Sequence, residues 1–339
     1  MINRNMNSPF FLRPVGKDYL WGGNRLNEVF HKNIEMTPLA ETWECSTHPD
    51  GTSIVASGEW EGQLLSAVLK AHPEYLGTHP REVMRSHGLP EQELPILIKF
   101  IDARKDLSIQ VHPGDAYAYE KEQGQLGKTE MWYVLDATED ASLIYGLNRG
   151  VSAECIREAI AKGSLEKYLQ RVNIRKNDVF FIPAGTIHAI GAGALIAEIQ
   201  ENSNLTYRLY DYGRVDKNGF PRKLHVDKAL EVADLTEARK PVQPMRVLRY
   251  RKGVAMELLC RCEYFQVERV LLNTENDPGD ANRWVPFHTE SNSFAVFLCV
   301  DGCGTIDDAS FHIGDCVFLP ADSKEVSLRG TAQFLKVSC

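Results

Sequence analysis

The chain of 339 residues has no long apolar run and no excess of positive charge. No stretch approaches the roughly 18 consecutive apolar residues of a membrane-spanning helix, and residues 1–11 lack the charged and then apolar order of a signal peptide. Asp and Glu number 46 against 38 Lys and Arg, a formal net charge of −8. No broad basic surface therefore exists to hold nucleic acid or an anionic membrane. We expect a cytoplasmic protein with neither partner, and its oligomeric state is left open.

Paired cysteines and glycine-rich phosphate loops are also missing. The eight cysteines are scattered without a C-x-x-C pair, which argues against a disulfide framework and against a thiolate zinc site. No Walker or dinucleotide-binding loop is present. A phosphate group would have to be held by side chains.

What the sequence does contain is a series of short apolar runs, rich in β-branched and aromatic residues and separated by Gly, Asn and Asp. Such runs predict strands, here at 95–101, 107–111, 131–135, 142–145, 179–182 and 194–199. Helices are predicted at 63–72, 80–87, 152–170 and 223–233, and Ser152 is suited to cap the third. The chain is therefore expected to be mainly β with a small helical element.

Two structural units are expected from the length of the chain and from an internal sequence repeat. Residues 177–184 read Asn-Asp-Val-Phe-Phe-Ile-Pro-Ala, and residues 314–321 read Gly-Asp-Cys-Val-Phe-Leu-Pro-Ala. This similarity predicts two copies of one β fold. The proline-containing segment 237–245 reads as a linker, which divides the chain into units 1–240 and 241–339.

The two copies differ at positions that matter for chemistry. When they are aligned, His188 stands opposite Glu325 and Glu130 stands opposite Ala295. The first unit is therefore expected to carry the chemistry, and the second to be a degenerate copy without metal ligands.

Four side chains of the first unit form a candidate metal site. Gln110 and His112 are two apart in a predicted strand and so share one face, Glu130 opens the next strand, and His188 follows a Pro-Ala-Gly turn. One amide, two imidazoles and a carboxylate suit Zn²⁺, and also Fe²⁺ or Mn²⁺. Each residue alone is more often structural, but their presence in one strand-rich block favours a shared metal.

Several segments accompany these candidates in order along the chain: Tyr19-Leu-Trp-Gly-Gly23, Ala40-Glu-Thr-Trp-Glu44, His48-Pro-Asp-Gly51, Leu97-Ile-Lys-Phe100, Leu107-Ser-Ile-Gln-Val-His-Pro113, Gly127-Lys-Thr-Glu-Met-Trp132, Pro183-Ala-Gly-Thr-Ile-His188 and Glu198-Ile-Gln-Glu-Asn-Ser203. Together with Arg208 they resemble the type I mannose-6-phosphate isomerases (phosphomannose isomerases) of the cupin superfamily, in their compact bacterial form. Leu-Ser-Ile-Gln-x-His-Pro is specific to this family, whereas Pro-Ala-Gly-Thr-x-His recurs across cupins.

The resemblance implies two cupin-like, jelly-roll β-barrel domains and a sugar phosphate substrate. It also implies that mannose 6-phosphate and fructose 6-phosphate are interconverted through an enediolate. One zinc ion would be bound by Gln110, His112, Glu130 and His188. Arg208 would be the active-site arginine, Lys128 would lie beside the metal, and Ser108 would lie near the substrate phosphate.

The residues themselves suggest how the proton and the phosphate are handled. Lys128, two residues from a metal ligand, could transfer protons. Glu198 is a rival base, because a strand that buries Leu195, Ala197 and Ile199 turns Glu198 toward the metal. Phosphate would be held by Ser108, Arg208 and Lys99.

Two alternatives stay open. Two histidines and one carboxylate also form the site of non-haem iron oxygenases, although Gln110 as a fourth ligand would leave too few open positions. A non-catalytic sugar-binding module is the second alternative, and the presence of Lys128 and Arg208 beside intact ligands disfavours it. Arg208 could also be a surface residue paired with Asp211 or Glu201.

Overall fold

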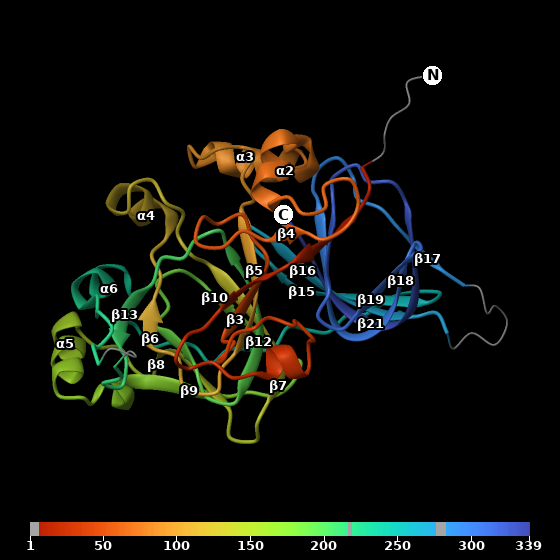
Figure 1. Ribbon diagram of the computed structural model, residues 1–339. Coiled ribbons are helices and arrows are strands. Elements are labelled where there is room, and N and C mark those ends of the chain that lie inside the picture. The colour runs from red at the N-terminus through yellow and green to blue at the C-terminus, as the bar shows by residue number, and fades with distance from the viewer. Residues whose placement is uncertain (1–6, 216–218, 276–282) are drawn as a thin grey trace.

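The computed structural model describes residues 7–215, 219–275 and 283–339 and consists mainly of β-strands (Figure 1). The strands form antiparallel sheets of six, five and ten strands, which confirms the expected mainly β fold. No sheet closes into a barrel within these ranges, because each strand order is an open path. None of the helices in these ranges has the length and apolarity that crossing a bilayer requires. The expectation that residues 1–11 form no signal peptide concerns residues 1–6 in part, and these six residues lie outside the described ranges.

The six-stranded sheet is the middle layer. Every residue of its two central strands, β5 (Ile96–Asp102) and β12 (Ala194–Glu201), is buried, because one face of the sheet packs on the five-stranded sheet and the other on the ten-stranded sheet. Strands covered on both faces read as continuous apolar runs, and the predicted strands at 95–101 and 194–199 are confirmed. In spatial order the strands are β10 (Val179–Ile182), β7 (Glu130–Ala137), β12 (Ala194–Glu201), β5 (Ile96–Asp102), β3 (Glu41–Cys45) and β2 (Val15–Lys17).

The five-stranded sheet faces the middle sheet across a shared apolar cluster that includes Trp132, Ile190 and Ile196. Its outer face packs on residues of α5 (Ala153–Ala161) and α6 (Val226–Val232), which lie beside it in Figure 1. The strands are β13 (Tyr207–Tyr210), β6 (Ile109–Val111), β11 (His188–Ile190), β8 (Ser142–Leu147) and β9 (Leu169–Asn173).

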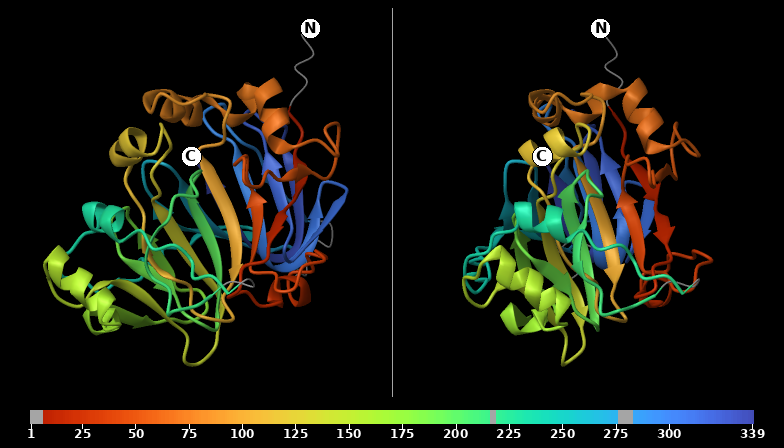
Figure 2. Two further views of the ribbon diagram at one scale, coloured as in Figure 1. Left: turned by 60° about the vertical axis from the view of Figure 1, so that its left-hand side comes forward. Right: turned by 90° about the vertical axis from the view of Figure 1, so that its left-hand side faces the viewer.

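The ten-stranded sheet contains the C-terminal strands and two strands from near the N-terminus. Figure 2 shows it in blue and red beside the other two sheets. It folds around its own apolar cluster, which includes Val270, Phe297 and Phe334. The strands are β14 (Arg249–Arg251), β15 (Val254–Arg261), β16 (Gln266–Asn273), β17 (Val285–Phe287), β18 (Ala295–Ile306), β19 (Ala309–His312), β20 (Cys316–Leu319), β21 (Val326–Ser338), β1 (Phe10–Arg13) and β4 (Ile54–Val55).

The N-terminal strands connect the two halves of the chain. β1 pairs with β20 and with β4, so residues from the start of the chain extend the C-terminal sheet. Residues 238–248 form neither helix nor strand. The division at residue 240 stays a prediction.

Three predicted helices are confirmed, as α2 (Leu65–Ala71), α3 (Thr78–Ser86) and α6, and the helix predicted at 152–170 is only half right. Ser152 caps α5 as expected, since its hydroxyl accepts a hydrogen bond from the Cys155 amide. The helix ends before Gly163, whose φ of 63° is left-handed and suits glycine. A 3₁₀ turn (Leu165–Tyr168) and β9 follow. The remaining helical elements are α1 (Arg25–Glu28), α4 (Asp115–Lys121) and a 3₁₀ turn at Pro73–Leu76.

The predicted internal repeat agrees with the strand register. In the first copy Ile182 of β10 stands opposite Glu130 of β7. In the second copy Leu319 of β20 stands opposite Ala295 of β18. The two similar segments, residues 177–184 and 314–321, therefore occupy equivalent places beside equivalent strands.

Candidate metal centre and adjoining cavity

The four predicted metal ligands come from two facing sheets. Gln110 lies on β6 and stands opposite His188 of β11, and His112 follows β6 directly. Glu130 is the first residue of β7 in the middle sheet. One possible ligand atom from each of His112, Glu130 and His188 lies within 4.8 Å of the others, and all three residues are buried.

Both imidazoles are held by backbone carbonyls. His112 Nδ1 lies 2.6 Å from the Leu205 oxygen, and His188 Nδ1 lies 2.8 Å from the Thr186 oxygen. A carbonyl can only accept, so each Nδ1 carries the hydrogen, and each Nε2 presents a lone pair. The two Nε2 atoms face each other at 3.1 Å.

This arrangement fits a bound cation. Burial and the nearby Lys128 ammonium lower the pKa of both histidines, that of His188 to about 4, so no proton lies between the two lone pairs at neutral pH. Glu130 Oε1 is 3.3 Å from His188 Nε2 and is a buried oxygen without a hydrogen-bond donor among the described residues. Two imidazole nitrogens and one carboxylate oxygen thus converge, as in protein sites for divalent metals.

Gln110 completes the set on the same side. Its amide lies 3.3 Å from His188 Nε2. Because the nitrogen and oxygen of a side-chain amide are assigned from their surroundings, a half-turn of this amide would present its oxygen to the same point.

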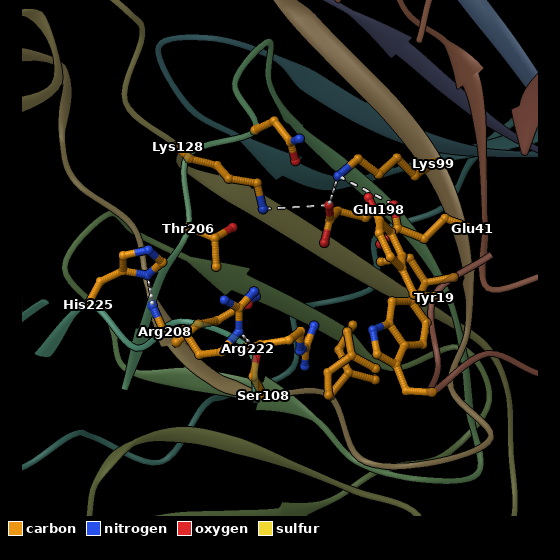
Figure 3. Close-up of a pocket in the computed structure, with 16 residues that line it drawn as sticks. Tyr19, Glu41, Lys99, Ser108, Lys128, Glu198, Thr206, Arg208, Arg222 and His225 are labelled. Carbon is orange, nitrogen blue, oxygen red and sulfur yellow. Dashed lines mark hydrogen bonds and ion pairs between the residues drawn. The ribbon is translucent and has the colours of Figure 1, made fainter. Parts of the chain in front are cut away.

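Beside the cluster lies a cavity of about 280 Å³ (Figure 3). The predicted catalytic and substrate-binding residues all line it: Lys99, Ser108, Lys128, Glu198 and Arg208. The cavity therefore brings together every predicted site residue that is not one of the three clustered ligands.

Glu198 is held between cations at one end of this cavity, as Figure 3 shows. Lys99 Nζ lies 3.2 Å and Lys128 Nζ 3.6 Å from its Oε1, and the Trp132 indole donates a hydrogen bond of 3.0 Å to Oε2. Burial alone would raise the pKa of Glu198, but Lys128 and Lys99 outweigh it and lower this pKa to about 2. Its position on the face of β12 opposite Ala197 agrees with the predicted alternation.

Lys128 lies on a backbone that is fixed on both sides. The Gly127 amide donates a hydrogen bond of 2.7 Å to the Asp115 carboxylate, and the Thr129 amide donates one of 2.6 Å to the Glu201 carboxylate. A Cβ at position 127 would lie 2.6 Å from the Asp115 amide nitrogen, so only glycine allows this close approach. The Lys128 ammonium is bonded to Glu130 and lies 3.2 Å from His112 Nε2.

Arg208 lies at the other end of the cavity. Its Nε lies 3.2 Å from the Ser108 hydroxyl, and its backbone amide donates to His225. The alternative pairing with Asp211 is wrong, because Arg222 binds that carboxylate through two bonds of 2.7 and 2.5 Å and Arg214 binds it as well. Burial and the nearby Arg222 charge lower the pKa of Arg208.

Arg222 and His225 also line the cavity, and sequence reasoning missed both. They lie in an irregular segment between β13 and α6. The helix predicted at 223–233 begins only at Val226, so helical periodicity does not show which way either side chain turns. The one signal was composition, since residues 222–225 read Arg-Lys-Leu-His just after a glycine and a proline.

Comparisons with known proteins agree with one another. Residues 10–137 match the family model of the type I phosphomannose isomerase catalytic domain. The chain is 35% identical over 332 residues to the mannose-6-phosphate isomerase ManA of Bacillus subtilis, which covers 96% of this chain and 97% of that protein. It is 37% identical over 262 residues to the mannose-6-phosphate isomerase of Streptococcus mutans, with coverage of 77% and 78%.

The same similarity holds in three dimensions. A crystal structure of the mannose 6-phosphate isomerase from Bacillus subtilis matches with a TM-score of 0.85 and 35% identity. The match covers 98% of this chain and 99% of that chain. It confirms the expected cupin-like fold.

Proposed function

Because the chain belongs to the type I phosphomannose isomerase family, we propose that the cluster and its cavity are the active site of a metal-dependent isomerase. The reaction is the interconversion of mannose 6-phosphate and fructose 6-phosphate. The observation that carries this assignment is the convergence of His112 Nε2, His188 Nε2 and the unpartnered Glu130 Oε1 beside a cavity with cations at both ends.

The proposed metal is one Zn²⁺ per chain, held by His112, Glu130, His188 and the Gln110 amide. Imidazole and carboxylate ligands suit zinc, and both histidines have the backbone hydrogen bonds that orient such ligands. A divalent metal here supplies Lewis-acid stabilisation for the charge that develops on the two sugar oxygens during isomerisation.

Glu198 and Lys128 are proposed to handle the proton that moves between C1 and C2. Glu198 is ionised and lines the cavity, so it can accept a proton from the sugar carbon. The Lys128 ammonium can donate a hydrogen bond to a sugar oxygen as negative charge forms on it. Lys99 lies between Glu198 and Glu41, which supports a role in fixing Glu198. Its predicted contact with phosphate stays a prediction.

The phosphate is proposed to bind at the opposite end of the cavity, against Ser108, Arg208 and Arg222. Two guanidinium groups that repel each other in the free protein favour an anion between them. A substrate anchored there by its 6-phosphate extends its C1 and C2 toward Glu198 and the metal ligands. This placement makes the phosphate group a positioning handle for the reaction.

The isomerase assignment is favoured over the oxygenase and the sugar-binding module by the family and by the groups around the cavity. The direct test is incubation with mannose 6-phosphate and measurement of fructose 6-phosphate. We expect turnover by the native chain and none by His188→Ala, which should lose the metal while keeping its fold. A correctly folded, metal-loaded native chain without turnover would contradict the proposal.

A further inference from the structure

A second cavity, of about 500 Å³, lies in the ten-stranded sheet and is separate from the active site. Its wall includes Val254 and Phe287, which belong to or pack against the apolar cluster inside that sheet. The remaining lining is mostly charged or polar and comes from β14–β17, from the segments that follow β17 and precede β21, and from β21 itself. It therefore has the character of a polar binding site rather than of a packing defect.

The strand register makes this cavity the counterpart of the active site. In the first copy Glu198 of β12 stands opposite Trp132 of β7 and Lys99 of β5. Trp132 lies two residues beyond Glu130 along β7.

In the second copy Lys336 of β21 stands opposite Phe297 of β18 and Glu268 of β16. Phe297 lies two residues beyond Ala295, the counterpart of Glu130. Lys336 thus takes the place of Glu198, and Glu268 takes the place of Lys99.

The ion pair in the wall of each cavity is conserved in position and reversed in charge. Lys99 and Glu198 are 3.2 Å apart in the first copy, and Lys336 and Glu268 are 2.9 Å apart in the second. Lys336 also lies over the Phe287 ring, 5.4 Å from its centre. The second cavity therefore presents a cation at the position where the first presents its proton acceptor.

The second cavity lacks the groups for the same chemistry. Ala295 replaces Glu130, which removes the central carboxylate. Among the described residues, the one group of His, Cys, Asp and Glu side chains with metal-binding geometry is that of the first cavity. What is retained is a place to bind a ligand, without the means to transform it.

Two arginines define the ligand that fits. Arg249 and Arg251 lie on the same face of β14, line the cavity and are exposed, and neither forms an ion pair with any described residue. Two free guanidinium groups beside one cavity suit a phosphate monoester. The Gln266 amide and the carboxylate of Glu325 offer hydrogen bonds to hydroxyl groups.

We propose that this cavity is a second, non-catalytic binding site for a sugar phosphate. The arginines bind the phosphate, and the amide and carboxylate groups bind the sugar hydroxyls over the half-buried Phe287 ring. The inference rests on the residues of the second cavity and on their equivalence in strand register to those of the first, and it does not depend on catalysis in the first.

The test is calorimetric titration with glucitol 6-phosphate, which has no carbonyl group and cannot be isomerised. The chains compared are the native protein, the double variant Arg249→Ala/Arg251→Ala, Arg208→Ala to weaken the first cavity, and Tyr250→Ala. Tyr250 lies between the two arginines, is 75% exposed and points to the other face of the strand, so it is the matched control.

We expect two ligands per native chain. The double variant should bind only one of the two, with affinity at the second cavity at least tenfold weaker. Tyr250→Ala should bind both ligands. Arg208→Ala should still bind the ligand of the second cavity. Unchanged ligand number and affinity in the double variant would overturn the inference. Equally tight binding of inorganic phosphate alone at this site would overturn its sugar component.

An isomerase assay on the same preparations separates this inference from the proposed function. The double variant should turn over mannose 6-phosphate at the native rate. Turnover without a second bound ligand contradicts the inference alone, and a second bound ligand without turnover contradicts the proposed function alone.

Discussion

Arg208 is available to a substrate because its nearest competitor is occupied. Asp211, three residues away on the same segment, is bound by both Arg214 and Arg222. Arg208 therefore bonds to the Ser108 hydroxyl and the Lys223 carbonyl, which do not neutralise its charge. An unneutralised, partly buried guanidinium beside a cavity is suited to bind an anion.

Replacing Arg208 by alanine should leave the metal in place and lower kcat/KM for mannose 6-phosphate by about 10² to 10³, since a charge-assisted contact to the substrate is lost. Arg208→Lys, which keeps the charge but not the planar fork, should retain part of the activity. Steady-state kinetics together with metal analysis measure both effects. A kcat/KM near the native value in the alanine variant would show that Arg208 does not contact the substrate.

Arg222→Ala should raise KM for mannose 6-phosphate about tenfold with a smaller effect on kcat, because the contact is proposed to be with the phosphate and away from the reacting carbons. Arg214→Ala is the matched control, since Arg214 shares Asp211 but does not line the active cavity. An equal rise in KM in both variants would assign the effect to the loss of Asp211 pairing instead.

The segment between α4 and β7 carries Lys128 and is held in place by residues of the C-terminal half of the chain. Asp115, which binds the Gly127 amide, accepts a hydrogen bond of 2.6 Å from the Tyr264 hydroxyl and lies 3.0 Å from His87 Nε2. Tyr264 lies between β15 and β16. The C-terminal half of the chain thus helps to position a residue of the proposed active site.

Tyr264→Phe removes this hydroxyl while keeping the ring. One hydrogen bond of this kind contributes about 1 kcal/mol, so a less precisely placed Lys128 should lower kcat about fivefold. Metal content and KM should stay unchanged. Tyr250→Phe, on an exposed strand, is the control, and an unaltered kcat in Tyr264→Phe would show that Lys128 does not depend on this contact.

The sequence predicted the strands of the middle sheet well because burial on both faces gives them long apolar runs. The placing of Gln110 and His112 on one side could be predicted for a different reason, because the two residues are two apart along and directly after β6. The pairing of β1 with β20 joins residues about 300 positions apart, and no local pattern encodes it. Arg222 was missed because its inward direction depends on Asp211, a contact formed only in the folded chain.

A buried ion pair connects the N-terminal segment to both halves of the molecule. Lys32, between α1 and β3, lies 2.6 Å from Glu44 of β3 and also donates to the Gly314 carbonyl before β20. The two side chains are 5% and 0% exposed. Burial raises the pKa of Glu44, and the Lys32 ammonium opposes this rise.

Lys32→Met should destabilise the fold by about 3 to 5 kcal/mol, because it leaves the Glu44 carboxylate buried without its cation. Thermal unfolding measures the loss, and adding Glu44→Gln to the variant should recover part of it. Lys162→Met is the control, since its pair with Glu158 is exposed to solvent and should contribute little to stability. Similar losses in Lys32→Met and Lys162→Met would contradict a structural role for the buried pair.

Metal analysis combined with turnover assays before and after chelation shows whether this chain is a metal-dependent isomerase of sugar phosphates. We expect about one zinc per chain, conversion of mannose 6-phosphate to fructose 6-phosphate, loss of conversion on chelation and recovery when Zn²⁺ is restored. Conversion that persists after complete metal removal would contradict this function, as would a fully metal-loaded chain that does not convert mannose 6-phosphate.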